Sequence, residues 1–187
     1  MVSGPVRVHL VRHGRASAGW DRDPDPDLDD TGWIQAHRFA EQIAASGPMA
    51  LCSSPLQRCR STAQPLEVVW RVEARVEPTI AEIPSPDGVA MADRVDWLRT
   101  AIRGTWTQLG SHYVDYRDSV IDWVASRTAD TVAVSHFVAI NAVIGACLGD
   151  DRILIRQLDN CSITTVEVSN GEVKLIEAGH EADTVIR

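Results

Sequence analysis

A short apolar strand that ends in Arg12-His13-Gly14 constrains the fold of this chain most. The residues from Val6 to Val11 are mostly apolar or β-branched, and Gly14 ends the run, which predicts a buried strand delivering its last residues to a loop. In an open α/β sheet, ligands bind beyond the carboxyl ends of the strands. Arg12 and His13 are therefore expected where chemistry is done, and a guanidinium beside an imidazole suits an anionic substrate such as a phosphate.

Composition and charge limit what the 187-residue chain can be. With 44% hydrophobic and 24% charged residues it resembles an ordinary globular protein, and its length predicts one domain over residues 1–187. The net charge of −8 argues against non-specific binding to nucleic acid or to anionic membranes, so a bound anion needs a local cluster of Arg and His. No membrane-spanning run or secretion signal is recognisable, and a cytoplasmic location is expected.

Apolar spacing and turn residues predict alternating strands and helices. Strands are expected at 49–52, 70–76 and 131–134, and helices at 32–46, 56–69, 90–103, 111–126 and 138–148. Asn170-Gly171, between alternating runs at 163–168 and 172–177, predicts a C-terminal β-hairpin. This order favours an α/β fold with a single domain, in which a mainly parallel sheet is flanked by helices and ends in the hairpin.

An aspartate-rich stretch, residues 16–30, follows the first strand. Its two prolines and repeated aspartates exclude a helix interior or a central strand, which predicts a surface loop. Asp29 or Asp30 can cap the helix that comes next. Because the loop directly follows Arg12-His13-Gly14, its negative charge is expected to repel anionic groups around the pocket and to narrow the choice of substrate.

Two further strand ends carry polar residues toward the same edge of the predicted sheet. The second strand leads to a helix that holds Arg58 in its first turn, and the later strand leads to His136. With Arg12 and His13, these residues can surround a dianionic phosphoryl group with donors, and the positive end of the helix that begins near Pro55 adds to the field. Phosphoryl transfer requires such positioning and stabilisation of charge on the phosphoryl oxygens.

Three motifs along the chain occur in the order of a known family. They are residues 10–14 (Leu-Val-Arg-His-Gly), 52–63 (Cys-Ser-Ser-Pro-Leu-Gln-Arg-Cys-Arg-Ser-Thr-Ala) and 134–136 (Val-Ser-His). Together they resemble the histidine phosphatase superfamily, which includes the cofactor-dependent phosphoglycerate mutases. Residues 29–36, with Gly32-x-x-Gln35-Ala36, also resemble the start of a helix in that family. The resemblance covers most of the chain, from the first strand to the helix after His136.

The resemblance implies a role for each matching residue. His13 would be the nucleophile that becomes a phosphohistidine, while Arg12, Arg58 and His136 would hold the phosphoryl oxygens. Relatives also have an acidic proton donor between the second and third motifs, and our candidate is Glu82, because apolar neighbours in the irregular segment 78–88 can raise its pKa. The other acidic candidates are Glu77, Asp87 and Asp93.

Departures from the family pattern favour a phosphatase over a mutase. Many relatives have a threonine and an asparagine after Arg-His-Gly that contact phosphate, and here Ser17 is expected to replace one of them. The chain also lacks a recognisable segment for binding a substrate carboxylate or retaining a bisphosphate. We therefore expect a phosphatase acting on a small phosphorylated metabolite or on a phosphoprotein, such as a phosphohistidine protein. Arg60 is expected to point away from the substrate.

Three alternatives remain. A mutase would keep the phosphoryl group on His13 and return it to the substrate. A non-catalytic phospho-ligand binding module would retain affinity without turnover. A metalloenzyme built on His13 and His136 is disfavoured, since the arginines around them repel a cation and no local ligand spacing exists, so no cofactor or metal is expected.

A homodimer is compatible with an exposed sheet edge or an exposed tryptophan. The cysteines are expected to be reduced small hydrophobes, and they are Cys52, Cys59, Cys147 and Cys161.

Overall fold

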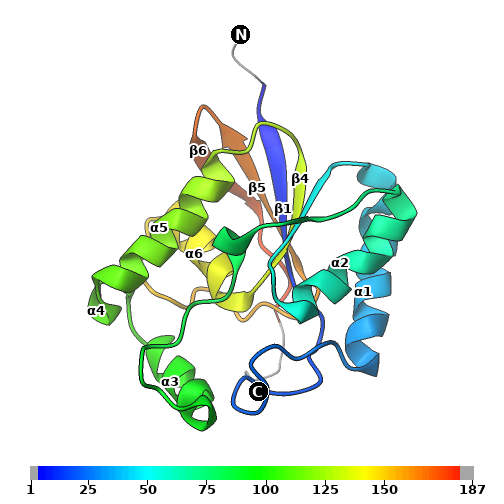
Figure 1. Cartoon of the computed structure of the whole chain (residues 1–187). Coiled ribbons are helices and arrows are strands. Elements are labelled where there is room, and N and C mark those ends of the chain that lie inside the picture. The colour runs from blue at the N-terminus through cyan, green and yellow to red at the C-terminus, as the bar shows by residue number, and fades with distance from the viewer. Residues whose placement is uncertain (1–3, 182–187) are drawn as a thin grey trace.

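A mixed six-stranded sheet forms the centre of the computed structural model, which describes residues 4–181 (Figure 1). The strands lie in the order β3-β2-β4-β1-β5-β6. They are β1 (Val6–Arg12), β2 (Ala50–Ser53), β3 (Arg75–Val76), β4 (Thr131–Ser135), β5 (Ile163–Ser169) and β6 (Glu172–Glu177). The first four in sequence pair in parallel, while β5 and β6 run antiparallel to their neighbours. The predicted α/β fold with a mainly parallel sheet, flanking helices and a C-terminal hairpin is confirmed.

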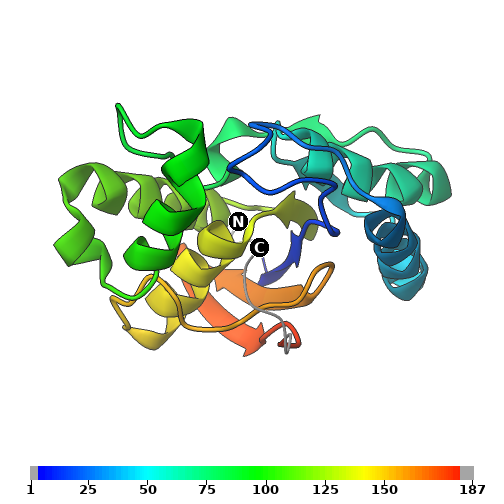
Figure 2. The same ribbon diagram turned by 90° about the horizontal axis from the view of Figure 1, so that it is seen from below.

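Helices cover both faces of the sheet (Figures 1 and 2). On one face lie α1 (Asp30–Ile43) and α2 (Gln57–Trp70), and on the other lie α4 (Trp106–Leu109), α5 (Ser111–Ala125) and α6 (Phe137–Leu148). The short helix α3 (Arg94–Ala101) lies beyond the lower end of the sheet in Figure 1, beside the loop that follows β1. Short 3₁₀ helices complete the chain: η1 (Ala44–Ser46), η2 (Pro78–Ile80) and η3 (Met91–Asp93). None of the helices among residues 4–181 is long and apolar enough to cross a membrane.

The core consists of two apolar clusters, one on each face of the sheet. Alternate residues of β4 belong to different clusters, with Val132 and Val134 packed with Phe39 of α1, and Ala133 packed with Ile140 of α6. This alternation follows from the two-residue period of a strand, and because both faces are covered the strand is apolar throughout. The sheet is therefore fixed from both sides, which makes its carboxyl edge a rigid support.

The register of the parallel strands brings three strand ends to one edge. In the ladders, Arg12 lies opposite Ser135 and Ser53 lies opposite Val134. Just past these pairs, the backbone N–H of His13 donates to the carbonyl of Ser135 at 3.0 Å, and the chain then leaves the sheet. The residues that follow β1, β2 and β4 consequently emerge side by side at the lower end of the molecule in Figure 1.

Two local predictions hold in detail. The side chain of Asp29 caps α1 by accepting a hydrogen bond from the N–H of Gly32 at 2.8 Å. The hairpin turns at Asn170 and Gly171, whose φ angles of 53° and 79° are the left-handed pair that a two-residue turn of this type needs. All four cysteines are unpaired, as expected.

Other boundaries were predicted wrongly. The strand expected over 70–76 is limited to Arg75–Val76, since α2 continues to Trp70. The indole of Trp70 is buried and donates to the carbonyl of Ala44 at 3.0 Å, which fixes this residue as the last of the helix before Arg71 adopts a left-handed conformation. The helix expected over 90–103 divides into η3 and α3, and α4 was not predicted. The helix expected from 56 begins at Gln57, so Pro55 precedes it by two residues.

Candidate active site

A small cavity of about 100 Å³ lies at the carboxyl edge of the sheet, and Arg12, His13, Arg58 and Glu82 line it. Arg12 and His13 come from the end of β1, Arg58 from the first turn of α2, and Glu82 from the segment after η2. The other lining residues are small or apolar: Ala16, Ala18, Gly19, Trp20, Pro26, Leu98 and Phe137. Four predicted site residues from three separate parts of the sequence therefore share one cavity.

His13 is held as a neutral imidazole with a defined tautomer. Its Nδ1 lies 2.7 Å from the carbonyl oxygen of Gly14. Because a carbonyl only accepts hydrogen bonds, Nδ1 carries the proton and Nε2 keeps its lone pair. Burial lowers the pKa of His13 well below its usual value, and the nearby positive charges of Arg58 and Arg12 lower it further. The imidazole therefore presents an unprotonated Nε2 at neutral pH.

His136 lies behind Arg58 and is fully buried, so it lines neither cavity of this end of the molecule. The Nη2 atom of Arg58 is 3.2 Å from Nδ1 of His136, and since a guanidinium only donates, Nδ1 accepts. The proton of His136 is then on Nε2, which lies 2.7 Å from Oγ of Ser54. Burial lowers the pKa of His136 as well, and the nearby charges of Arg58 and Arg12 lower it further. The ring centroids of the two histidines are 5.2 Å apart.

Arg12 and Arg58 supply the positive charge of the cavity. Arg58 donates from Nε to Nε2 of His13 at 3.2 Å, in addition to its contact with His136. Arg12 donates to the carbonyl of Leu158 and lies over the ring of Phe137, with 5.0 Å between its Cζ atom and the ring centroid. Each guanidinium also has one buried N–H without a partner among the described residues, Nε of Arg12 and Nη1 of Arg58. Two fixed cations in one cavity favour a dianionic group.

Glu82 is a partly buried carboxyl group beside these cations. Burial raises its pKa above the usual value, although the N–H of Ile83 and the charges of Arg58 and Arg12 oppose the shift. A carboxyl group that keeps its proton to higher pH can serve as a general acid.

Two hydroxyl groups fix the backbone that carries Glu82. The hydroxyl of Ser135 donates to the carbonyl of Ile80 at 2.7 Å, and the hydroxyl of Tyr116 donates to the carbonyl of Ala81 at 2.8 Å. The flanking Ile80 and Ile83 are buried in the core. The two residues before Glu82 are thus tied to β4 and α5, and Ile83 after it is held by burial.

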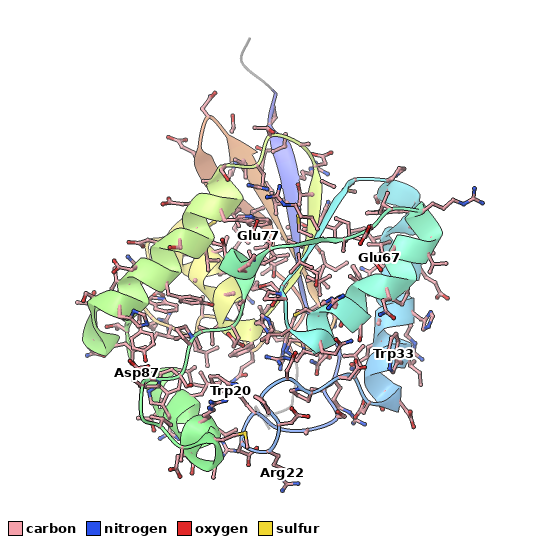
Figure 3. The ribbon with its side chains drawn as sticks, in the orientation of Figure 1. Trp20, Arg22, Trp33, Glu67, Glu77 and Asp87 are labelled. Atoms are coloured by element: carbon pink, nitrogen blue, oxygen red, sulfur yellow. The ribbon has the colours of Figure 1, made fainter. Side chains whose placement is uncertain are left out.

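The other acidic candidates lie elsewhere. Glu77 caps η2, accepting hydrogen bonds from Thr79, while Asp87 and Asp93 are exposed. None of these three lines the cavity. Figure 3 labels Glu77 and Asp87. Arg60 is exposed, in agreement with the expectation that it points away from the substrate.

A wider cleft of about 880 Å³ adjoins the cavity and also reaches Arg12 and His13. Ser17 lines this cleft, as Arg12 and His13 do, but it does not line the small cavity of Arg58 and Glu82. Asn160, which the sequence analysis missed, also lines the cleft and donates from Nδ2 to the carbonyl of His13 at 2.8 Å. No local sequence pattern indicates this contact, because Asn160 lies far from His13 in the sequence and only the fold brings the two residues together.

The loop that carries His13 rests against the start of α1. A Cβ atom added to Gly32 would lie 2.2 Å from the carbonyl oxygen of Arg15, and one added to Gly14 would lie 2.7 Å from the carbonyl oxygen of Gly32. The side chain of Gln35 accepts a hydrogen bond from the N–H of Arg15 at 2.8 Å. The Gly32-x-x-Gln35 pattern therefore allows close contact between the loop and the helix and then holds it. Among residues 4–181, no group of three or more His, Cys, Asp or Glu side chains is arranged to hold a metal ion.

Comparison with known proteins gives matches over nearly the whole chain. The family model of the histidine phosphatase superfamily (branch 1) matches residues 8–180. A protein of Mycobacterium tuberculosis, Rv0525, is 30% identical over 150 residues, which cover 70% of this chain and 73% of that protein. A probable phosphoglycerate mutase of Yersinia pestis, GpmB, is 24% identical over 187 residues, covering 87% of this chain and 85% of the other.

Solved structures share the fold. The mycobacterial glucosyl-3-phosphoglycerate phosphatase Rv2419c, in its complex with VO3, has a TM-score of 0.71 at 24% identity and covers 95% of this chain and 100% of its own. The phosphoserine phosphatase of Entamoeba histolytica in complex with 3-phosphoglyceric acid has a TM-score of 0.72 at 21% identity, covering 94% of this chain and 97% of its own. At these identities the likeness concerns the fold.

Proposed function

The chain belongs to the histidine phosphatase superfamily, and we propose that it is a phosphatase that hydrolyses phosphomonoesters, or phosphohistidine, through a phosphohistidine intermediate on His13. The observation that carries this proposal is the hydrogen bond between Nδ1 of His13 and the carbonyl of Gly14, which leaves Nε2 as a neutral lone pair in a cavity with two arginines and a carboxyl group. Such an arrangement combines a nucleophile, a phosphoryl-binding charge and a proton donor.

In the first step, Nε2 of His13 attacks phosphorus, and the bond between phosphorus and the ester oxygen breaks. Protonated Glu82 gives its proton to the departing oxygen, which leaves as an alcohol. The phosphorylated imidazole, still protonated at Nδ1, is a cation, and the carbonyl of Gly14 stabilises it by accepting that proton in a hydrogen bond. Arg12 and Arg58 bind the phosphoryl oxygens and stabilise their charge.

In the second step, water attacks the phosphorus and the ionised Glu82 accepts a proton from it. The bond between phosphorus and Nε2 breaks, its electron pair returns to the nitrogen, and inorganic phosphate is released. Glu82 is then protonated again and His13 is neutral, so the enzyme returns to its starting state. The wide cleft beside the cavity supports hydrolysis, because it gives water a path to the intermediate.

Arg58 links the two histidines in this scheme. Its Nε–H donates to the lone pair on Nε2 of His13 at 3.2 Å. A bound phosphoryl group has to draw this N–H from the nitrogen to its own oxygens before attack. His136 keeps the other end of the guanidinium in place during this exchange, since it accepts from Nη2. We therefore assign to His136 the role of holding Arg58, through which it acts on the phosphoryl group.

The substrate we expect is a small phosphorylated metabolite or a phosphohistidine protein. A mutase is the second candidate, because a relative carries that name. It would perform the same first step and then return the phosphoryl group to an alcohol instead of water. A binding module is the third candidate, and the paired nucleophile and proton donor make it the weakest.

Phosphate release from a panel of phosphorylated metabolites and one phosphohistidine protein, with a chelator present, tests the proposal. We expect the wild type to release phosphate and His13→Ala to release none. His37→Ala is the matched control, since His37 is exposed on α1, and it should retain full activity. Brief reaction with labelled substrate should yield an acid-labile phosphoprotein in the wild type. Release that requires a bisphosphate primer would indicate the mutase, and affinity without release would indicate the binding module.

A further inference from the structure

Two of the arginines that line the cleft outside the phosphoryl-binding cavity are paired with carboxylates. Arg15 forms an ion pair with Asp29, with 2.5 Å between Nε and Oδ2, and also donates to the hydroxyl of Thr31 at 2.9 Å. Arg99 forms an ion pair with Asp96, with 2.9 Å between Nη1 and Oδ1. Each of these guanidinium groups thus already has a carboxylate partner.

The remaining charges of the cleft make it slightly negative. Arg22 lines its edge but is exposed, and Figure 3 shows its side chain extending away from the body of the molecule. Asp21 and Asp159 line the cleft as well, and among the described residues neither forms an ion pair with an arginine. Apart from Arg12, which belongs to the phosphoryl site, three arginines therefore face four aspartates.

Neutral polar groups occupy the rest of the wall. The hydroxyl of Ser17 is exposed there, and the amides of Gln35 and Asn160 each use one atom on the protein and keep the other. The wall of the adjoining small cavity includes Trp20. Hydroxyl and amide groups beside an aromatic ring suit a ligand with several hydroxyl groups and no net charge.

We propose that the substrate carries its only anionic group on the reacting phosphate, and that its leaving group is an uncharged, hydroxylated molecule. The proposal rests on the phosphatase function proposed above and deepens it. Apart from Arg12 of the phosphoryl site and the outward-pointing Arg22, the arginines in the described wall of the cleft are paired with carboxylates. A carboxylate or a second phosphate on the leaving group would also meet Asp21 and Asp159, which form no ion pair with an arginine among the described residues. The preference is thus produced mainly by repulsion of the wrong substrates.

Matched pairs of phosphate esters test this preference. Glycerol 3-phosphate and 3-phosphoglycerate differ only in a terminal hydroxymethyl or carboxylate group, and fructose 6-phosphate and fructose 1,6-bisphosphate differ only in a second phosphate. We expect kcat/KM, or the inhibition constant against hydrolysis of p-nitrophenyl phosphate where turnover is slow, to favour the singly anionic member about five- to tenfold at low salt. Equal values, or a preference for the more anionic member, would overturn the proposal.

The source of the preference is tested by Asp96→Asn, which releases Arg99 from its ion pair. This variant should improve kcat/KM for 3-phosphoglycerate several-fold relative to glycerol 3-phosphate. Glu41→Gln is the control, because Glu41 is exposed on α1 outside the cleft and the substitution changes the net charge equally. An unchanged ratio in Asp96→Asn would contradict the proposal. Hydrolysis of p-nitrophenyl phosphate separates the two hypotheses: if it occurs, the phosphatase function stands whatever the pairs show, and if it does not, both fail.

Discussion

Nη2 of Arg58 lies 3.2 Å from Nδ1 of His136, and this contact makes a buried neutral histidine the anchor of a buried cation. The same guanidinium reaches His13 through Nε. Only a planar group with donors on several nitrogens can contact two imidazoles in this way and keep a further N–H for a ligand. The charge of the site is thus positioned by groups that cannot themselves become anions.

Replacement of Arg58 by lysine should therefore be severe although it preserves the charge. The ammonium group cannot reach both histidines, so we expect kcat/KM to fall by about two orders of magnitude or more. Arg60→Lys, on the exposed side of the same helix, is the control and should retain wild-type kinetics. Steady-state kinetics of both variants test this prediction. Similar kcat/KM values for the two variants would mean that a positive charge at position 58 is sufficient.

Tyr116→Phe should disturb the proton donor from a distance. It removes the hydroxyl that binds the carbonyl of Ala81, next to Glu82, and leaves that carbonyl without its partner. We expect the free energy of unfolding to fall by about 1–3 kcal/mol, and kcat to fall more than KM rises, because Glu82 is less well placed. Tyr113→Phe is the control, since the hydroxyl of Tyr113 makes no hydrogen bond within residues 4–181. A variant with an unaltered pH profile and unaltered kcat would refute a positioning role for Tyr116.

The pH dependence of activity should reflect the opposite shifts of nucleophile and acid. The lowered pKa of His13 keeps the nucleophile neutral to a pH below the usual histidine value of about 6.5. The raised pKa of Glu82 keeps the donor protonated to a pH above the usual 4.5. We expect single-turnover rates of the first step to fall as pH rises through the pKa of Glu82, and Glu82→Gln to remove this alkaline decline together with most of the activity. A wild-type rate independent of pH above 4.5 would exclude Glu82 as the acid.

Glu82 on the one hand and the two histidines on the other make the free energy of unfolding change with pH in opposite directions. Between 4.5 and the raised pKa of Glu82 the folded state holds more protons than the unfolded state, so this group makes the free energy of unfolding decrease as pH rises. Below about 6.5 the unfolded state protonates His13 and His136 while the folded state does not, so their contribution is lost as pH falls. Urea unfolding of the wild type and Glu82→Gln across this range should show that the variant loses the first trend and keeps the second.

Gly32→Ala should damage the site through the backbone. The new Cβ would lie 2.2 Å from the carbonyl oxygen of Arg15, and neither side of this contact is a flexible side chain. We expect the free energy of unfolding to fall by about 1–3 kcal/mol, with a loss of kcat as the loop that carries His13 moves. Gly4→Ala is the control, because an added Cβ there meets nothing within 4 Å. Chemical denaturation and steady-state kinetics of both variants test this. Equal free energies of unfolding and equal kcat values for the two variants would show that the close contact is unimportant.

The sequence allowed the fold and four residues of the cavity to be predicted, because the signals were local or lay at strand ends. The apolar run before Arg12, the apolar strand before His136 and the Asn170-Gly171 turn each indicate their structure without reference to distant residues. The position of Glu82 was predicted from the family resemblance and its segment, and the structure brings it to the cavity that His13 lines. Its catalytic role stays a proposal.

The errors concern positions where distant contacts decide. Trp70 has the aromatic character of a strand residue and was predicted to begin one, but its burial against the end of α1 keeps it in α2. Asn160 binds the backbone of His13 from near the far end of the chain, and its neighbours in sequence do not indicate that contact. The placement of His136 behind Arg58, rather than in the cavity wall, likewise depends on how two helices approach one strand.

The contact between Trp20 and Trp97 has a consequence for how this scaffold can acquire new substrates. The two rings, 6.3 Å apart between centroids, join the loop after β1 to α3, and Arg94 of α3 lies over Trp20. These two segments line the small cavity and the cleft, whereas the strand ends hold the groups proposed for the chemistry. The loop after β1 and α3 therefore have to be exchanged together. A chimaera that takes both segments from one relative is expected to change the substrate preference and to keep the residues proposed for the chemistry.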